Sequence, residues 1–207
     1  VDQIAQYVSG PMMDEMGRSR CDYNLTEGKW FEYEVPWHTG QAVNALLAAY
    51  KQTGKKTYLD AAIRGGNYWV GLEIKDHPVL KGMVDARHGD SIGEDFIVFA
   101  TVSDGTPGIY ELSRVTKNPK YAKVATSAAY WMMKNMYDAN KGICYDNIDA
   151  KTGEVLKESS PFWKNKKEQT LFDVSRPNTE GWLFKDAFEF SGDTKFKEAF
   201  INLCNSL

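Results

Sequence analysis

The sequence predicts an all-α protein organised as an (α/α) toroid, in which helical hairpins stack around a common axis. The main observation is a turn that recurs three times without gaps, as TGKKTYLDAA (53–62), TKNPKYAKVA (116–125) and SGDTKFKEAF (191–200). The alignment places Tyr58, Tyr121 and Phe196 at equivalent positions. A unit that recurs with long, variable inserts is typical of repeat architectures. A plain helical bundle or solenoid would show the same periodicity, and the inserts favour the toroid.

Each repeat joins a mostly apolar helix to an amphipathic one. Within 41–50 only Gln41 and Asn44 are clearly polar, so this first helix should be buried nearly all round. The second helix, over 57–72, mixes apolar and polar side chains and should cover the first with one face. An inner buried helix followed by an outer amphipathic one is the repeating unit of an (α/α) toroid.

The turn between the two helices carries its own signals. Gly54 and Gly192 should adopt the left-handed conformation that ends the first helix of a pair. Thr57 and Thr194 should then cap or begin the second helix.

Two further segments complete the predicted elements. Residues 1–16 carry an apolar face and should form a helix that is kinked at Gly10 and stops soon after 16. The segment FIVFATV (96–102) fits either a buried helix start or a short strand. Including 1–16, the chain supplies about seven helices, fewer than a closed toroid uses. We therefore expect residues 1–207 to form a single domain that is an incomplete or truncated toroid, or one that another chain completes.

The composition limits the classes of partner. The formal net charge is −3, and the Lys and Arg residues are scattered, so the basic stripe of a nucleic-acid-binding protein is missing and no nucleic-acid partner is expected. No apolar run is long enough to cross a bilayer, so we expect no membrane insertion. Three distant cysteines and three histidines make neither a disulfide framework nor a zinc site, so we expect no metal and no cofactor. Cysteine usage leaves the compartment open: we suspect a periplasmic or secreted location, and a cytoplasmic one stays open.

Long segments precede the inner helices, at 18–38, 73–103 and 138–178. Structureless loops of this length are uncommon in compact domains and are usually functional. Because all three lead into inner helices, they should converge on one mouth of the toroid. The helix N-termini present free N–H groups and positive dipole ends there. We therefore expect a functional site at this mouth.

The first approach, WFEYEVPWHTGQ (30–41), combines aromatic rings with polar groups. Trp37 could form a wall of a sugar-binding groove, because ring faces pack well against sugar CH groups. His38 and Gln41 could donate or accept hydrogen bonds with sugar hydroxyls. The alternative is that Thr39 caps the helix while the rings pack beneath it.

The second insert is rich in acids. Five carboxylates fall within 82–108, together with Arg87 and His88 as candidate substrate-binding residues. Asp95 and Asp104 are the candidates for catalysis. Asp104 precedes Gly-Thr-Pro at the start of an inner helix, so an N-cap role is the alternative for this residue.

The third insert ends in DVSRPNTEGWLF (173–184), whose polar residues stand at the same place in the repeat as those of the other approaches. Arg176 is a suitable partner for a sugar carboxylate because its planar fork matches that group, although a surface salt bridge would explain it equally well. Asn178 is a further candidate for substrate binding. Glu180 is a candidate catalytic acid, or a structural residue that interacts with the helix dipole.

Hydrolysis of a glycosidic bond needs one carboxyl group to protonate the leaving oxygen and a second acid or base to handle water or the anomeric carbon. Carboxylates from different hairpins could meet at the mouth for this purpose. We predict Asp104 and Glu180 as the pair, with Asp95 as a substitute.

Three segments of the sequence resemble a known scaffold: LLAAYKQTGKKTYLDAA, DGTPGIYELSRVTKNPKYAKVA and NMYDANKGICYDNID. They are similar to the recurring hairpins of the six-hairpin glycosidase-like superfamily of (α/α) toroids, over residues 36–207. The superfamily includes unsaturated uronyl hydrolases and rhamnogalacturonyl hydrolases, which use acidic residues near the inner-helix mouths. The resemblance implies that Asp104 corresponds to such an acid by position. The superfamily also contains polysaccharide lyases and sugar epimerases, and the fold does not choose among them.

The sequence therefore favours a glycoside hydrolase that acts on an acidic oligosaccharide or polysaccharide fragment. One alternative is an epimerase or lyase, in which His38 or His88 would act as the base. The other is a non-catalytic glycan-binding or interaction domain, which self-association or the rest of a toroid would complete.

Overall fold

The computed structural model describes residues 1–31, 36–87, 95–163, 165–176 and 181–206, with only the backbone of residue 176. The longer helices are α1 (Asp2–Ser9), α2 (Pro36–Thr53), α3 (Lys56–Gly71), α5 (Thr106–Thr116), α6 (Pro119–Asn135), α8 (Trp182–Ser191) and α9 (Thr194–Asn205). The short helices are α4 (Phe99–Ser103), α7 (Leu171–Val174) and a 3-10 turn at Pro161–Trp163. The prediction of a helical protein built from repeated hairpins is confirmed.

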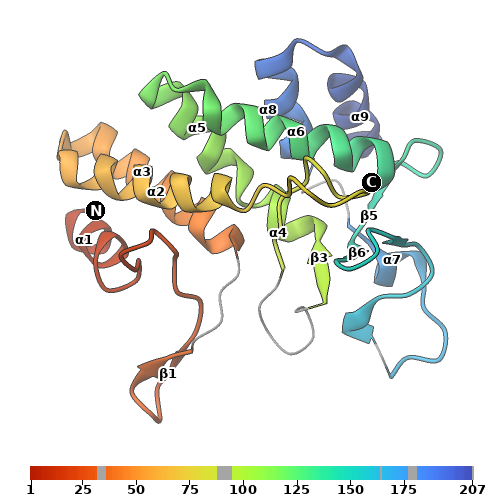
Figure 1. The fold of residues 1–207 in the computed structure, drawn as a ribbon, viewed down its shortest axis with the longest axis horizontal. Coiled ribbons are helices and arrows are strands. Elements are labelled where there is room, and N and C mark those ends of the chain that lie inside the picture. The colour runs from red at the N-terminus through yellow and green to blue at the C-terminus, as the bar shows by residue number, and fades with distance from the viewer. Residues whose placement is uncertain (32–35, 88–94, 164, 177–180, 207) are drawn as a thin grey trace.

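The helices form three hairpins, α2/α3, α5/α6 and α8/α9, which follow one another from left to upper right in Figure 1. The first helix of each pair contacts the first helix of the next, so that α2, α5 and α8 make one row. Helices α3 and α6 pack against each other in a second row. This arrangement is the one expected for inner and outer helices of a toroid.

The turns inside the three hairpins are equivalent in conformation. Gly54 (φ 70°), Lys117 (φ 57°) and Gly192 (φ 72°) occupy the same aligned position, and each adopts the left-handed conformation. The expected C-terminal role of Gly54 and Gly192 is therefore confirmed. In the middle repeat a lysine, Lys117, adopts this left-handed conformation.

Of the two roles expected for the threonines, Thr194 has the second, since it begins α9, and neither threonine caps a helix. The caps stand earlier in the aligned turn: the side chains of Asn118 and Asp193 accept hydrogen bonds from the backbone N–H groups two residues ahead, at 3.1 and 3.0 Å. Thr194 is the first residue of α9, and Thr57 lies inside α3. Asn and Asp are strong N-cap residues because their short side chains reach these N–H groups.

The N-terminal helix is shorter than expected. Helix α1 ends at Ser9, so the Gly10-Pro11 pair terminates the helix where a kink was predicted. Asp2 anchors α1 to the first hairpin: its carboxylate accepts a hydrogen bond from the Lys55 ammonium at 2.7 Å and its backbone oxygen accepts one from the Tyr58 hydroxyl at 3.3 Å.

Short strands lie within the inserts. They are β1 (Tyr23–Asn24), β2 (Lys29–Trp30), β3 (Phe96–Val98), β4 (Tyr137–Asp138), β5 (Ile143–Tyr145), β6 (Asn147–Asp149), β7 (Val155–Leu156) and β8 (Ser175–Arg176). They form the antiparallel sheets β1-β2, β3-β6-β7 and β4-β5-β8. Segment 96–102, for which the sequence left open a buried helix start or a short strand, contains both, because the strand β3 runs directly into the helix α4. The β1 hairpin, β3, β6 and α7 all lie below the helices in Figure 1.

Helices α2 and α5 approach each other closely at their N-terminal ends. A Cβ added at Gly108 would lie 2.0 Å from the carbonyl oxygen of Gly40, and one added at Gly40 would lie 2.2 Å from that of Gly105. Both separations are far below van der Waals contact. Only glycine permits this approach, which fixes the starts of two inner helices against each other.

At the other end of the inner helices, ionic groups join α2, α5 and α8. Arg114 donates hydrogen bonds to Asp186 at 2.8 Å and to Glu189 at 2.7 Å, and Glu111 pairs with both Arg114 and Lys51. Asp186 is only 7% exposed. Burial raises the pKa of its carboxyl above the ordinary value, and Arg114 opposes that rise.

We expect Arg114→Leu to lower the free energy of unfolding by about 2 kcal/mol at neutral pH, because it leaves Asp186 buried without its cation. Without Arg114 the pKa of Asp186 in the folded state should rise further, while the unfolded value stays at the ordinary one. Between these two values only the folded state binds the proton, so lowering the pH should restore part of the lost stability. Urea denaturation at pH 7 and pH 5 measures the free energy of unfolding of the variant and of the wild type.

The double variant Arg114→Leu/Asp186→Asn is the matched control, since it has no carboxyl group to protonate at this position. Its stability difference from the wild type should change less between the two pH values. An equal deficit of Arg114→Leu at both pH values would contradict the assignment.

Candidate functional site

Asp104 and Trp37 lie where the first two inner helices begin. Asp104 directly follows α4, and the residue after it packs on α2: a Cβ added at Gly105 would lie 3.4 Å from the Cα atom of Trp37. Asp104 is not the N-cap of α5, because Gly105 holds that position. The capping alternative for Asp104 is therefore wrong.

His38 and Gln41 face a different neighbour. They line an open pocket of about 280 Å³ together with Cys21 and residues of the α1 side. The imidazole of His38 lies 5.3 Å from the Trp37 ring, centroid to centroid. Thr39 does not cap α2: it lies inside the helix, and its hydroxyl accepts a hydrogen bond from the Ser19 N–H at 2.9 Å.

The second insert brings Asp95 and Arg87 to the same strand. Asp95 is exposed just before β3, and its carbonyl oxygen accepts a hydrogen bond from the Ala150 N–H at 2.8 Å. Arg87 forms a β-bridge with Ile97, and its guanidinium pairs with Asp85 at 2.7 Å. This ion pair is exposed, so its contribution to stability is small and a substrate anion could compete for the guanidinium.

The remaining candidates, from the second and third inserts, are described only in part. His88, Asn178 and Glu180 lie outside the described residues, and Arg176 is described by its backbone alone, which pairs with Cys144 in the β5–β8 ladder. The pairing of Asp104 with Glu180 stays a prediction.

Asp146 is a buried acid that the sequence analysis did not select. It is 4% exposed and stands between β5 and β6. Its carbonyl oxygen accepts a hydrogen bond from the Phe99 N–H at 2.7 Å, and its own N–H donates to Val174 at 3.0 Å. Asp146 therefore joins the segment that enters α4 to the segment that leads toward α8. The signal in the sequence was the polar pair Asp-Asn inside the apolar run ICYDNI.

Further polar groups are buried around Asp146. Asn147 is 0% exposed, and its amide nitrogen lies 3.4 Å from the Asp146 carboxylate and 3.5 Å from the Ser160 hydroxyl. The side-chain oxygens of Asn147 and Thr101 have no hydrogen-bond partner among the described residues. Buried polar atoms are normally satisfied, so each of these two oxygens needs a partner beyond the protein atoms that the structure describes.

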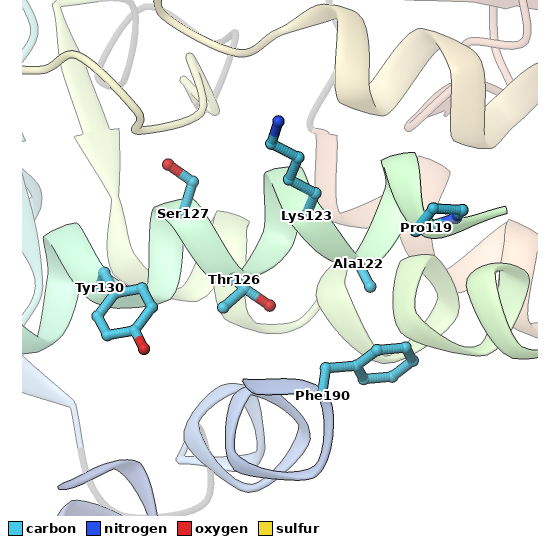
Figure 2. A pocket seen from close by; sticks show the side chains of 7 residues that line it. All are labelled: Pro119, Ala122, Lys123, Thr126, Ser127, Tyr130 and Phe190. Atoms are coloured by element: carbon cyan, nitrogen blue, oxygen red, sulfur yellow. The ribbon is translucent and has the colours of Figure 1, made fainter. Parts of the chain in front are cut away.

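A separate cavity of about 450 Å³ lies between α6 and α8 (Figure 2). Tyr130, Thr126 and Phe190 are among its lining residues. None of the described candidate residues lines it. It is therefore not part of the predicted site.

The described residues also bear on metal binding and on membrane crossing. In this part of the chain, no group of three His, Cys, Asp or Glu side chains is placed to hold a metal ion. No described helix combines the length and the apolar character that crossing a membrane requires.

No protein-family model matches the chain, and no curated protein matches it in sequence. Solved structures match it by fold. It is similar to the cellobiose 2-epimerase of Bacillus thermoamylovorans, with 13% identity and a TM-score of 0.68 over 99% of this chain and 55% of that one. It is also similar to a D-mannose isomerase, with 11% identity and a TM-score of 0.64 over 99% and 50%. The GH76 α-mannanase of Bacteroides thetaiotaomicron matches at 14% identity and a TM-score of 0.61, over 83% and 43%.

These likenesses show the fold. The chain has the (α/α)-toroid fold of these structures, and the expected resemblance is confirmed at the level of the fold. The chain spans about half the length of the solved structures that it matches. The expectation of an incomplete toroid agrees with this coverage.

Proposed function

We propose that this chain is part of a carbohydrate-active enzyme, a glycoside hydrolase that acts on an acidic oligosaccharide at the N-terminal ends of its inner helices. The supporting observation is the packing of Gly105 on α2, which brings the backbone just before α5, where Asp104 stands, close to the backbone of Trp37 in the first turn of α2. An acid beside an aromatic ring is the combination that protonates a glycosidic oxygen while a sugar stacks on the ring.

The roles follow from the chemistry of each group. Asp104 protonates the leaving oxygen, and Glu180 or Asp95 acts on water or on the anomeric carbon. Arg87 and Arg176 bind the carboxylate of the substrate, because a guanidinium pairs with that group in a planar, bidentate geometry.

A second candidate function is epimerisation of a sugar. Its support is that solved structures with TM-scores of 0.68 and 0.64 are a cellobiose 2-epimerase and a D-mannose isomerase. His38 would be the base, since it lies on the first turn of α2 and lines an open pocket.

Product analysis distinguishes the two functions. The 207-residue chain is incubated with unsaturated uronyl oligosaccharides, with mannan oligosaccharides and with cellobiose, and the products are separated by chromatography. A hydrolase produces shorter sugars and new reducing ends, with the highest rate on the acidic substrates. An epimerase converts cellobiose to an isomer of the same mass without new reducing ends. Binding of these sugars with neither reaction would reject both proposals in favour of a glycan-binding domain.

A further inference from the structure

The cavity between α6 and α8 combines a polar side with an aromatic one. The side chains that line it belong to these two helices, and Phe190 is the one that α8 supplies. Figure 2 shows Lys123 and Ser127 on one side of α6 and the ring of Phe190 facing the other side. The volume of about 450 Å³ lies within the range of small-molecule sites. A ligand in this cavity would therefore meet polar groups and a ring face together.

Helices of the array flank this cavity on both sides. In the outer row, α6 packs against α3 on one side. On the other side, Tyr130 of α6 packs against Phe196 of α9, with their ring centroids 4.6 Å apart. Pro119 is the first residue of α6, and Phe190 is the last but one of α8, so the cavity lies toward the turns of the hairpins. It is therefore inside the array and away from the N-terminal ends of the inner helices.

Two aromatic rings of the cavity are held in place and remain exposed. Phe190 is 38% exposed, and the Arg114 guanidinium lies 4.9 Å from its ring centroid. Tyr130 is 41% exposed, and its hydroxyl donates a hydrogen bond to the Asp193 carboxylate at 3.1 Å. A side chain that the protein already holds loses little conformational entropy when a ligand packs on it. These ring faces therefore suit the CH groups of a sugar.

The polar side of the cavity offers a cation and a hydroxyl group. Lys123 and Ser127 are four residues apart, so their side chains are neighbours on α6. Lys123 is exposed, and among the described residues neither side chain has a hydrogen-bond or ion-pair partner. The preceding lysine of α6 differs, because the Lys120 ammonium donates to the side-chain oxygen of Asn67 at 2.6 Å. The Lys123 ammonium is therefore available to an anion.

The charges around the cavity also orient an anion. Asp193 lies at the Tyr130 end, where it accepts the tyrosine hydroxyl and caps α9 by accepting a hydrogen bond from the Lys195 N–H at 3.0 Å. Lys123 stands about two turns of α6 before Tyr130, roughly 10 Å along the helix axis. A carboxylate group is therefore attracted to the Lys123 end and repelled from the Asp193 end.

We propose that this cavity binds a uronate residue of an acidic polysaccharide, as a second carbohydrate site apart from the candidate active site. The carboxylate pairs with Lys123, a sugar hydroxyl bonds to Ser127, and the CH face of the sugar packs on Phe190 or Tyr130. The choice of a uronate rests on the proposed function, whereas the call for an anion with an apolar face comes from the cavity itself. Such a site holds the polymer without taking part in the reaction.

Heteronuclear NMR of the 207-residue chain tests this site by its position. The probes are the disaccharide of galacturonic acid and cellobiose, a neutral disaccharide. The galacturonate disaccharide should shift the signals of Ala122, Thr126 and Ser127, and cellobiose at the same concentration should shift them much less. The signals of Gly40 and Gly105 report separately on the ends of the inner helices.

Variants test the groups that carry the recognition. Lys123→Gln should weaken binding of the galacturonate disaccharide about fivefold, because it removes the ammonium from a partly exposed ion pair. Lys123→Arg should keep most of the affinity. Tyr130→Leu should also weaken binding about fivefold, because a ring face is lost. Lys120→Gln is the matched control: it makes the same charge change on α6 outside the cavity, and the affinity should persist. Circular dichroism checks that each variant folds.

The outcomes separate this site from the proposed function. The absence of shifts on α6 would overturn the second site, and shifts at Gly40 and Gly105 alone would leave the proposed function in place. An equal loss of affinity in Lys123→Gln and Lys120→Gln would overturn it as well, because the attraction would then be a general effect of charge. Shifts on α6 without shifts at the two glycines would support the second site and count against the proposed function.

Discussion

Gly108→Ala is expected to lower the free energy of unfolding by about 3 kcal/mol or more. The added methyl carbon would lie 2.0 Å from the Gly40 oxygen and 2.9 Å from the Asn44 nitrogen, both in the backbone of α2. Backbone atoms inside a helix cannot move aside singly, so the two inner helices must separate. Guanidinium denaturation followed by circular dichroism measures the change.

Gly71→Ala is the matched control. Gly71 is also helical, and a Cβ added there meets nothing within 4 Å, so alanine should be neutral or slightly stabilising. The double variant Gly40→Ala/Gly108→Ala should cost less than the sum of the single changes, because helices that have separated once accommodate the second methyl group. If Gly108→Ala proved as mild as Gly71→Ala, the close approach of α2 and α5 would be wrong.

Asp104→Asn is expected to reduce turnover by about 10²- to 10⁴-fold, the usual contribution of a general acid, while the melting temperature changes little. The amide keeps the size of the side chain and cannot donate the proton. Since Gly105 is the N-cap of α5, the substitution removes no cap from that helix. Initial rates on the acidic oligosaccharide that is turned over fastest provide the measurement.

Asp60→Asn serves as the comparison, since Asp60 is an exposed acid on α3, which belongs to the outer row of helices. Its rate should equal that of the wild type. Equal rates for both variants would remove Asp104 from catalysis and leave Glu180 and Asp95 as the candidates.

The repeat made the scaffold predictable, because its signals are local. Gly54 and Gly192 mark the turns of the hairpins in the sequence and adopt the left-handed conformation there in the structure. The aligned aromatic residues Tyr58, Tyr121 and Phe196 are all buried, at 2%, 2% and 0% exposure. The equivalent role of Lys117 could be inferred only from the alignment, since lysine has no preference for a left-handed conformation.

The arrangement of the candidate site was less predictable because it depends on contacts between distant segments. The pairing of β3 with β6 joins two inserts, and this pairing buries Asp146 between them. No spacing in the sequence reports such a pairing. Trp37 and His38 are adjacent in the sequence but have different neighbours: Trp37 lies against Gly105, and His38 lies toward α1. This difference likewise depends on how the helices cross.

The glycine contact between α2 and α5 also bears on how this scaffold can change. The starts of α2 and α5 are held together at that point by main-chain atoms, while Trp37, His38 and Asp104 contribute the nearby side chains. If these side chains recognise the substrate, as proposed above, recognition can be redesigned, or can diverge during evolution, by exchanging them while Gly40 and Gly108 stay fixed. Libraries that randomise the three side chains should retain far more folded members than libraries that randomise the two glycines.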